Sequence, residues 1–285
     1  MIKYNPKDWF GLIFQFHKSD TFSKMGWVLL LFAVYTGLVV FTEITLENIF
    51  KSTTQIHSLL GFVLALLLVF RTNSAYDRWW EGRKQWGAMV NNTRNFSLKL
   101  NAVLSDDKSK TYWKNMITNY VFAMKEHLRE GVKMNELKLS EDLAHIKTNN
   151  HVPNAIAKDM HKQLNELYQT KVISGDQLIN LDKELKAFTD IIGACERIKK
   201  TPIPYSYSLF LKKFIFLYVI TIPFGLVVEF RFWTIPIATA ILYVLGSIEL
   251  IAEEIEDPFG TDANDLPTDG LSQTIKENLE EIFEV

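Results

Sequence analysis

The sequence predicts an all-α membrane protein with four transmembrane helices and a helical region on the cytosolic side. Its apolar residues lie in two blocks, residues 25–70 and 214–248, and a long polar stretch separates them. Lysine and arginine gather outside these blocks and are scarce in the short loops within them. The average composition hides this division, because 48% hydrophobic residues and a net charge of −2 would also suit a soluble protein.

The first block contains two candidate membrane spans. Residues 25–42 carry no charged side chain, and neither do residues 52–70. At about 1.5 Å per residue, each is long enough for a hydrocarbon core of about 30 Å. We therefore predict a cytosolic N-terminal segment over 1–24. Over 25–87 we predict two transmembrane helices, the second continuing unbroken beyond the membrane.

The second block is shorter and contains the other two spans. Residues 214–228 and 232–248 are apolar, and three residues between them predict a tight helical hairpin. Two lysines precede the third span and can extend their charged ends to the interface, so the span can begin near Tyr207. We assign 207–252 to these two helices.

The orientation follows from the distribution of positive charge. Four lysines precede the first span, and several lysines and arginines follow the second and precede the third. The loops on the other side hold only Lys51 and Arg231. Since positive residues favour the cytosolic side, both termini and the middle segment are predicted to lie there.

The middle segment, 88–206, is predicted to be helical. Helices are expected over 108–129 and 154–170, and a third from a capping box at Ser174 and Gln177 to near Lys200. The third helix carries an apolar stripe with steps of three and four residues: Leu178, Leu181, Leu185, Phe188, Ile192 and Cys195. Ile179 lies off this stripe, beside Asp182, Lys183 and Lys186. It is either a contact at the rim of another helix or a side chain that projects into a space shared between subunits.

The C-terminal segment, 253–285, is acidic. From residue 249 onward there are twelve acidic residues and one basic residue. Such a run is usually a solvated acidic tail. Four carboxylates, however, surround the turn at 258–260 and are oxygen ligands suited to Ca²⁺: Glu254, Asp257, Asp262 and Asp265. The spacing is not that of an EF-hand.

No catalytic motif is present, so the chain is not predicted to be an enzyme. The six histidines are scattered without metal-ligand spacing, and there is no phosphate-binding loop or nucleophile elbow. No pattern of basic and aromatic residues indicates nucleic acid. The predicted spans contain no acidic residue, which gives a proton-coupled transporter little support.

Residues 70–87 follow the second span with three tryptophans and several charged side chains. This composition is typical of an anchor at the membrane interface. A helix that leaves the membrane without a break could also line a continuous pathway.

Three elements of the chain resemble the bestrophin family, in its bacterial branch. They are Arg-Trp-Trp at 78–80, CERIKKTPIPYSY at 195–207 and EEIEDPFGTDANDLP at 253–267. They occur in the family's order and spacing across nearly the whole chain. Residues 105–175 match less distinctly.

The resemblance implies a homopentameric ion channel in the bacterial inner membrane, with each second transmembrane helix lining a central pore. The family's hydrophobic neck corresponds to Phe62, Leu66 and Phe70, and its cytosolic aperture to Ile179. In animal members the acidic turn belongs to a Ca²⁺ clasp. Glu254, Asp257, Asp262 and Asp265 match it, although two of them are carboxylates where the animal pattern has amides.

The sequence thus predicts a channel that conducts small monovalent ions passively. Its partners are other copies of the chain, membrane lipid and the permeant ions. No cofactor is required, and Ca²⁺ at the acidic turn is the one candidate ligand. Selectivity stays open, because chloride conduction follows from the family resemblance, whereas an acidic tail facing the pore would favour cations. The alternatives are a membrane-anchored helical scaffold or binding protein and an alternating-access carrier.

Overall fold

The computed structural model describes the chain except for residues 1–19, 47–48, 51–52, 139–144, 147–148 and 285. The described residues form helices and connecting turns, with no β-strand among them. They divide into two compact units. The first contains residues up to Arg78 together with 202–256 and 262–264, and the second contains 79–201, 257–261 and 265–285. The prediction of an all-α protein is confirmed.

Three helical stretches in the described part of the chain are long and apolar enough to cross a membrane. The first is α2 (Asp20–Leu46), and the second lies in the 50-residue helix α3 (Thr54–Val103). The third consists of α7 (Tyr205–Phe230) and α8 (Thr234–Glu256), joined by the short 3-10 helix η4 (Arg231–Trp233). Arg231 has a φ of 46°, so the chain reverses at the predicted hairpin.

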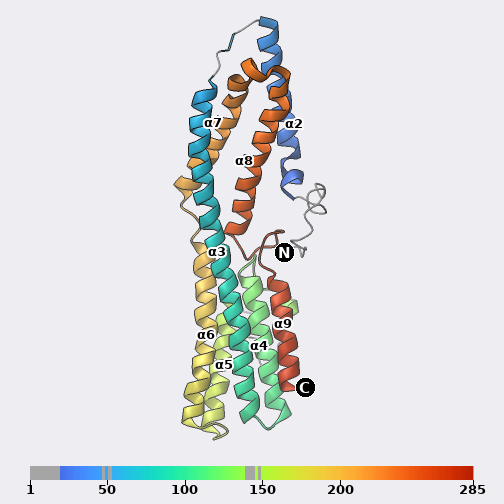
Figure 1. Ribbon diagram of the computed structural model, residues 1–285. Coiled ribbons are helices and arrows are strands. Elements are labelled where there is room, and N and C mark those ends of the chain that lie inside the picture. The colour runs from blue at the N-terminus through green and yellow to red at the C-terminus, as the bar shows by residue number, and fades with distance from the viewer. Residues whose placement is uncertain (1–19, 47–48, 51–52, 139–144, 147–148, 285) are drawn as a thin grey trace. The chain divides into compact units, whose positions relative to one another are not determined.

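The first unit is a helix bundle in which α2, α7 and α8 pack together (Figure 1). Its α3 segment joins α7 through Leu64, Leu68 and Leu211, which are all buried. Gly225 permits a close approach of α7 to α3, because a Cβ there would lie 2.9 Å from His57 Nδ1. A larger residue at 225 would therefore push the two helices apart.

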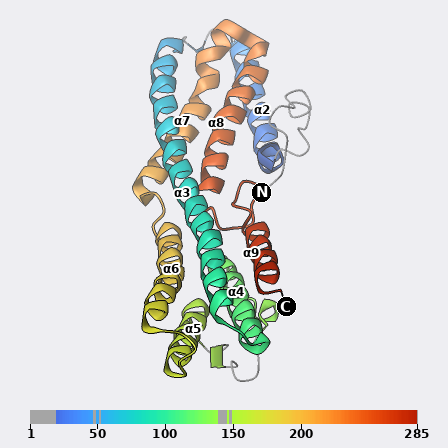
Figure 2. The same cartoon turned by 60° about the horizontal axis from the view of Figure 1, so that its bottom comes forward.

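The second unit contains the rest of α3, α4 (Asp107–His127), α5 (Val152–Gln169), α6 (Gly175–Lys200) and α9 (Thr268–Phe283). The 3-10 helix η2 (Met134–Glu136) lies between α4 and α5. In this unit α4 packs against both α9 and α5, and α5 packs against α6 (Figure 2).

Aromatic side chains from three helices meet in the core of the second unit. The Phe188 ring lies 5.7 Å from that of Phe96 and 5.2 Å from that of Tyr120. The Tyr120 hydroxyl donates a buried hydrogen bond of 2.8 Å to the carbonyl of Phe188. Trp86 is fully buried in this core. The interpretation of residues 70–87 as an interfacial anchor is therefore wrong for Trp86, which stabilises a protein interior.

The predicted helix starts are largely confirmed. Ser174 and Gln177 form the capping box at the start of α6, and five of the six stripe residues are buried. The helix predicted over 154–170 begins two residues earlier, at Val152. Pro153 lies in its first turn, where a missing N–H costs no helical hydrogen bond.

The acidic C-terminal segment is not a solvated tail. Residues 268–283 form α9, whose Ile275, Leu279 and Phe283 side chains are buried in the core of the second unit. Their spacing of four residues is that of one helix face. The acidic residues occupy the rest of the helix surface, so high charge and a packed face coexist in this segment.

A charged cluster attaches the start of α9 to α4. The Arg129 guanidinium donates two hydrogen bonds to Asp269, at 2.7 and 3.0 Å, and Lys125 Nζ lies 3.0 Å from the same carboxylate. These contacts lower the pKa of Asp269 to about 2, the Arg129 hydrogen bonds most strongly, while burial opposes the shift.

We expect Asp269→Asn to lower the free energy of unfolding by about 1 kcal/mol at neutral pH, a value kept small because the carboxylate is largely exposed. A carboxylate with a lowered folded-state pKa stabilises the fold above its ordinary pKa, and this contribution is lost as pH falls from about 4 to about 2. Unfolding of the purified full-length protein should therefore show a difference between wild type and variant that shrinks in acid.

The matched control is Glu280→Gln, because that carboxylate pairs with Lys276 of its own helix at 3.9 Å. It should change stability little at any pH. A difference for Asp269→Asn that stays constant down to pH of about 2 would contradict the assigned role of the ion pair.

Candidate pore-lining and ion-binding residues

The predicted neck residues share one exposed face of α3. The exposed fractions are 64% for Phe62, 45% for Leu66 and 62% for Phe70. Leu64 and Leu68, which point to the opposite side, are buried against α7. At about 100° per residue, side chains four apart stay within about 40° of each other, so the three form one apolar ridge. This arrangement is what a helix needs to line a pore or to contact other copies.

A buried charge network holds this helix within the first unit. Arg71 is 1% exposed, and its Nη2 lies 2.6 Å from Glu256 Oε2 on α8. A second carboxylate, Glu249, lies 3.6 Å from Arg71 Nε. A buried guanidinium without partners would be strongly unfavourable, and these carboxylates compensate its charge. In the sequence, Arg71 contributes to the orientation signal and to the charged stretch 70–87, but nothing there identifies its partners.

Ile179, the predicted aperture residue, is 70% exposed on the second turn of α6. The neighbouring stripe residues Leu181 and Leu185 are buried in the core of the second unit. An isoleucine with this exposure does not stabilise its own chain by packing. The structure therefore leaves it available for another copy or for a permeation pathway.

The four carboxylates of the acidic turn are divided between the units. In the first unit, Glu254 is buried and accepts hydrogen bonds from Lys24 Nζ at 2.9 Å and Asn264 Nδ2 at 2.6 Å. Asp262 lies 3.8 Å from the same lysine. In the second unit, Asp265 is buried and Asp257 is exposed.

Several other acidic residues after position 248 are paired with basic side chains. Glu249 and Glu256 meet Arg71, and Glu253 lies 3.1 Å from Lys212. Together with Glu254, Asp262 and Asp269, six of the twelve carboxylates therefore have a basic partner from another helix. The net field of this segment is weaker than its composition suggests.

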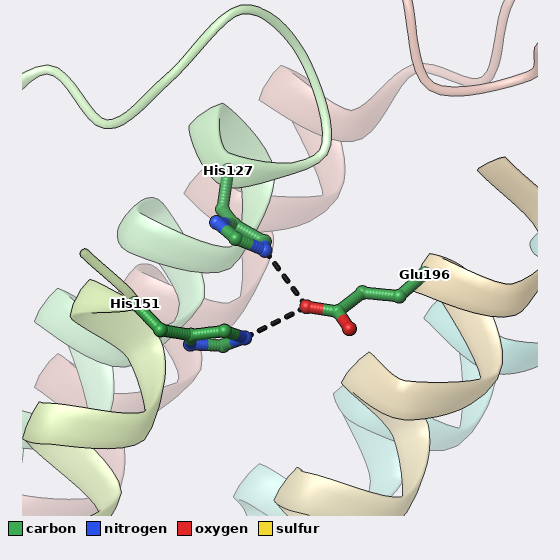
Figure 3. Close-up of side chains that lie close together, drawn as sticks. All are labelled: His127, His151 and Glu196. Carbon is green, nitrogen blue, oxygen red and sulfur yellow. Dashed lines mark hydrogen bonds and ion pairs between the residues drawn. The ribbon is translucent and has the colours of Figure 1, made fainter. Parts of the chain in front are cut away.

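Two histidines and a glutamate converge at three helix ends of the second unit. His127 is the last residue of α4, His151 precedes α5, and Glu196 lies in the last turns of α6. Each His Nε2 lies 2.7 Å from Glu196 Oε1 (Figure 3). Within the described residues, this is the one set of three His, Cys, Asp or Glu side chains with converging ligand atoms.

The electrostatics of this cluster keep the carboxylate ionised. Burial tends to raise the pKa of Glu196, but hydrogen bonds from His151, His127 and Lys200 outweigh it and lower that pKa to about 2. Burial is also the main cause of the lowered pKa of His127, against the opposing effect of Glu196. The imidazole of His127 is therefore neutral at pH 7.

This cluster cannot be recognised in the sequence. The histidines are scattered there, and His127 and His151 lie 69 and 45 positions from Glu196. Each residue does lie at a predicted helix end, but only the packing of the three helices joins them. Cys195, the neighbour of Glu196, is fully buried, and burial raises the pKa of its thiol to about 12. An unreactive thiol is thus the appropriate interpretation of Cys195.

The family model of the bacterial and fungal bestrophins matches residues 1–281. The chain belongs to the bestrophin family. This confirms the family suggested by the three sequence elements, and the apolar helices agree with a membrane protein.

Relatives and solved structures extend this result. This bestrophin is 39% identical over 233 residues to a voltage-dependent anion channel-forming protein of a Nostoc species, covering 78% of this chain and 75% of the relative. It is 31% identical over 283 residues to Escherichia coli YneE, which has the same description, covering 98% and 93%. These relatives are described as channel-forming proteins, in agreement with the prediction that the chain is not an enzyme.

A bestrophin homologue from Klebsiella pneumoniae has the same fold, with a TM-score of 0.85 at 28% identity over 90% of this chain and 97% of that one. A variant of that homologue gives a TM-score of 0.87 at 27% identity.

Proposed function

We propose that five copies of this chain form a channel that conducts small monovalent anions passively across the bacterial inner membrane. The observation that carries the proposal is the exposed ridge of Phe62, Leu66 and Phe70 on α3, opposite a face that is buried in the same unit.

The character of this face changes along the helix. Asn73 and Asp77, about one and two turns after Phe70, lie on the same side of α3 and are exposed. A face directed only at lipid has no need of a carboxylate, because burying one in hydrocarbon is costly. A face that lines a pore can pass from an apolar constriction to a polar vestibule.

Spacing along the helix sets the form of the constriction. Four residues rise about 6 Å, so five copies would present three stacked apolar rings. Such rings exclude water when narrow and admit partly hydrated ions when the helices separate. The neck is therefore proposed as the gate, and Ile179 of each copy as a second, cytosolic aperture.

The proposed ion preference rests on two supports. The relatives from Nostoc and Escherichia coli are described as anion channel-forming proteins. Moreover, basic partners neutralise carboxylates such as Glu253, Glu254 and Asp269. The argument that an acidic segment would favour cations is thereby weakened.

The proposed topology has four crossings with both termini in the cytosol. It rests on α2, α3, α7 and α8 as the crossing helices and on the excess of lysine and arginine on one side. Ca²⁺ at the acidic turn stays a prediction. The ion would have to displace Lys24 from Glu254, because the ammonium already contacts that carboxylate.

The first prediction concerns the sign of the current. Purified full-length protein in a planar bilayer under a KCl gradient should conduct, with a reversal potential close to the chloride equilibrium potential. A reversal potential of the opposite sign would overturn anion selectivity but keep the channel. An absence of conductance, or saturable coupled uptake in liposomes, would contradict the channel itself.

The second prediction concerns the neck. Replacing Phe62, Leu66 and Phe70 by Ala should widen the apolar rings and raise the conductance by on the order of twofold or more, or remove gating. Single-channel recording measures both effects.

Leu60→Ala is the matched control for Leu66→Ala. Leu60 is also exposed, at 36%, on the same helix. It points about 120° away from Leu66, at about 100° per residue. Equal effects of the two substitutions, or unchanged currents in the triple variant, would exclude the neck assignment.

The third prediction concerns the aperture. Ile179→Ala should change the permeability ratio between chloride and a larger anion by about twofold while leaving gating unchanged, because it widens a constriction separate from the gate. Val172→Ala, at a residue that is 46% exposed in the same unit, is the control. Identical permeability ratios in wild type and both variants would mean that Ile179 is a contact residue and not part of an aperture.

A further inference from the structure

His127, His151 and Glu196 have the composition of a metal site that uses three protein ligands. Two imidazoles and one carboxylate are the ligands of several zinc sites that keep a fourth position for water or another small ligand. All three potential ligand atoms lie within 4.8 Å of one another. We propose that these residues bind a divalent transition-metal ion of the Zn²⁺ class.

The distances agree with this class of ion. With metal–ligand bonds of about 2.0–2.1 Å, neighbouring ligand atoms of a tetrahedral zinc site are about 3.3 Å apart. Each His Nε2 now lies 2.7 Å from Glu196 Oε1, so each pair must open by about 0.6 Å to admit the metal. Small side-chain rotations provide this, since each ligand lies on a separate helix end.

Accessibility and charge also support the site. The side chains are 22%, 31% and 19% exposed for His127, His151 and Glu196, so an ion can enter from solvent without unfolding. Two imidazole nitrogens and one carboxylate oxygen are donors that an ion of this class prefers. Lys200, 3.2 Å from the second carboxylate oxygen of Glu196, is the cation that the metal would have to tolerate.

The competing interpretation is a hydrogen-bonded cluster that joins three helices without a metal. The geometry of His151 supports it, because its Nδ1 accepts the Asn154 N–H at 3.1 Å and caps α5. In that tautomer Nε2 carries the proton and donates to Glu196. Metal ligation at Nε2 moves the proton to Nδ1 and breaks the cap, a loss of about tenfold in an equilibrium constant.

That loss is small beside the gain from ligation. Zinc sites with a complete set of protein ligands reach dissociation constants many orders of magnitude below one molar. Two other histidines contact single carboxylates, His145 with Asp159 and His161 with Asp182. Among the described residues, neither pair has a third converging ligand, so the two pairs serve as controls.

The experiment is calorimetric titration of chelator-treated, full-length protein in detergent with Zn²⁺. We expect one ion per chain with a dissociation constant of micromolar or below, and a loss of about 100-fold in His127→Ala, His151→Ala and Glu196→Gln. His161→Ala should bind as wild type does, although His161 also joins α5 to α6. Absence of micromolar binding, or equal binding by wild type and all three variants, overturns the proposal.

A second measurement does not depend on the folding of the variants. X-ray absorption of the zinc-loaded wild-type protein should show a shell of nitrogen and oxygen ligands with two imidazoles. Zinc in excess should raise its unfolding temperature by about 5 °C, and that of His161→Ala equally. A sulfur ligand, or fewer than two imidazoles, would place the ion elsewhere. Neither result depends on whether the channel conducts.

Discussion

The burial of one face of α3 is the constraint on which the first unit depends. Arg71 is fixed among Glu256 and Glu249, and the Tyr207 hydroxyl donates to the Leu67 carbonyl at 2.9 Å. A charged group buried beside apolar helices tolerates little rotation, because any turn of the helix would separate it from its carboxylates. The same contacts therefore determine that Phe62, Leu66 and Phe70 face away from the rest of the first unit.

Ion pairs also compensate charge in the second unit, where they attach the start of one helix to another. Arg129 and Lys125 hold Asp269 and with it the start of α9, while Ile275, Leu279 and Phe283 bury the apolar face of that helix. Gly82 on α3 allows the Phe259 ring of the acidic turn to lie close, because a Cβ there would be 3.1 Å from it. Acidic residues in this region thus stabilise packing as well as carry charge.

Much of the fold was predictable from patterns within single helices. The uncharged runs predicted the membrane helices, and the capping box at Ser174 predicted the start of α6. The apolar face of α9 could also have been predicted, since Ile275, Leu279 and Phe283 are four residues apart. It was missed because the density of acidic side chains favoured a solvated tail, although charge on one face does not prevent burial of another.

The sequence by itself determined the helical class, the membrane segments and the family. Apolar runs, helix caps and short sequence motifs are local properties of the chain, so they can be recognised without a structure. Only the tertiary structure decided which side of α3 is exposed and which carboxylates Arg71 meets. It also decided that His127, His151 and Glu196 share one site. These are contacts between residues far apart in sequence. The periodicity of one helix does not specify which residue of another helix will lie against it.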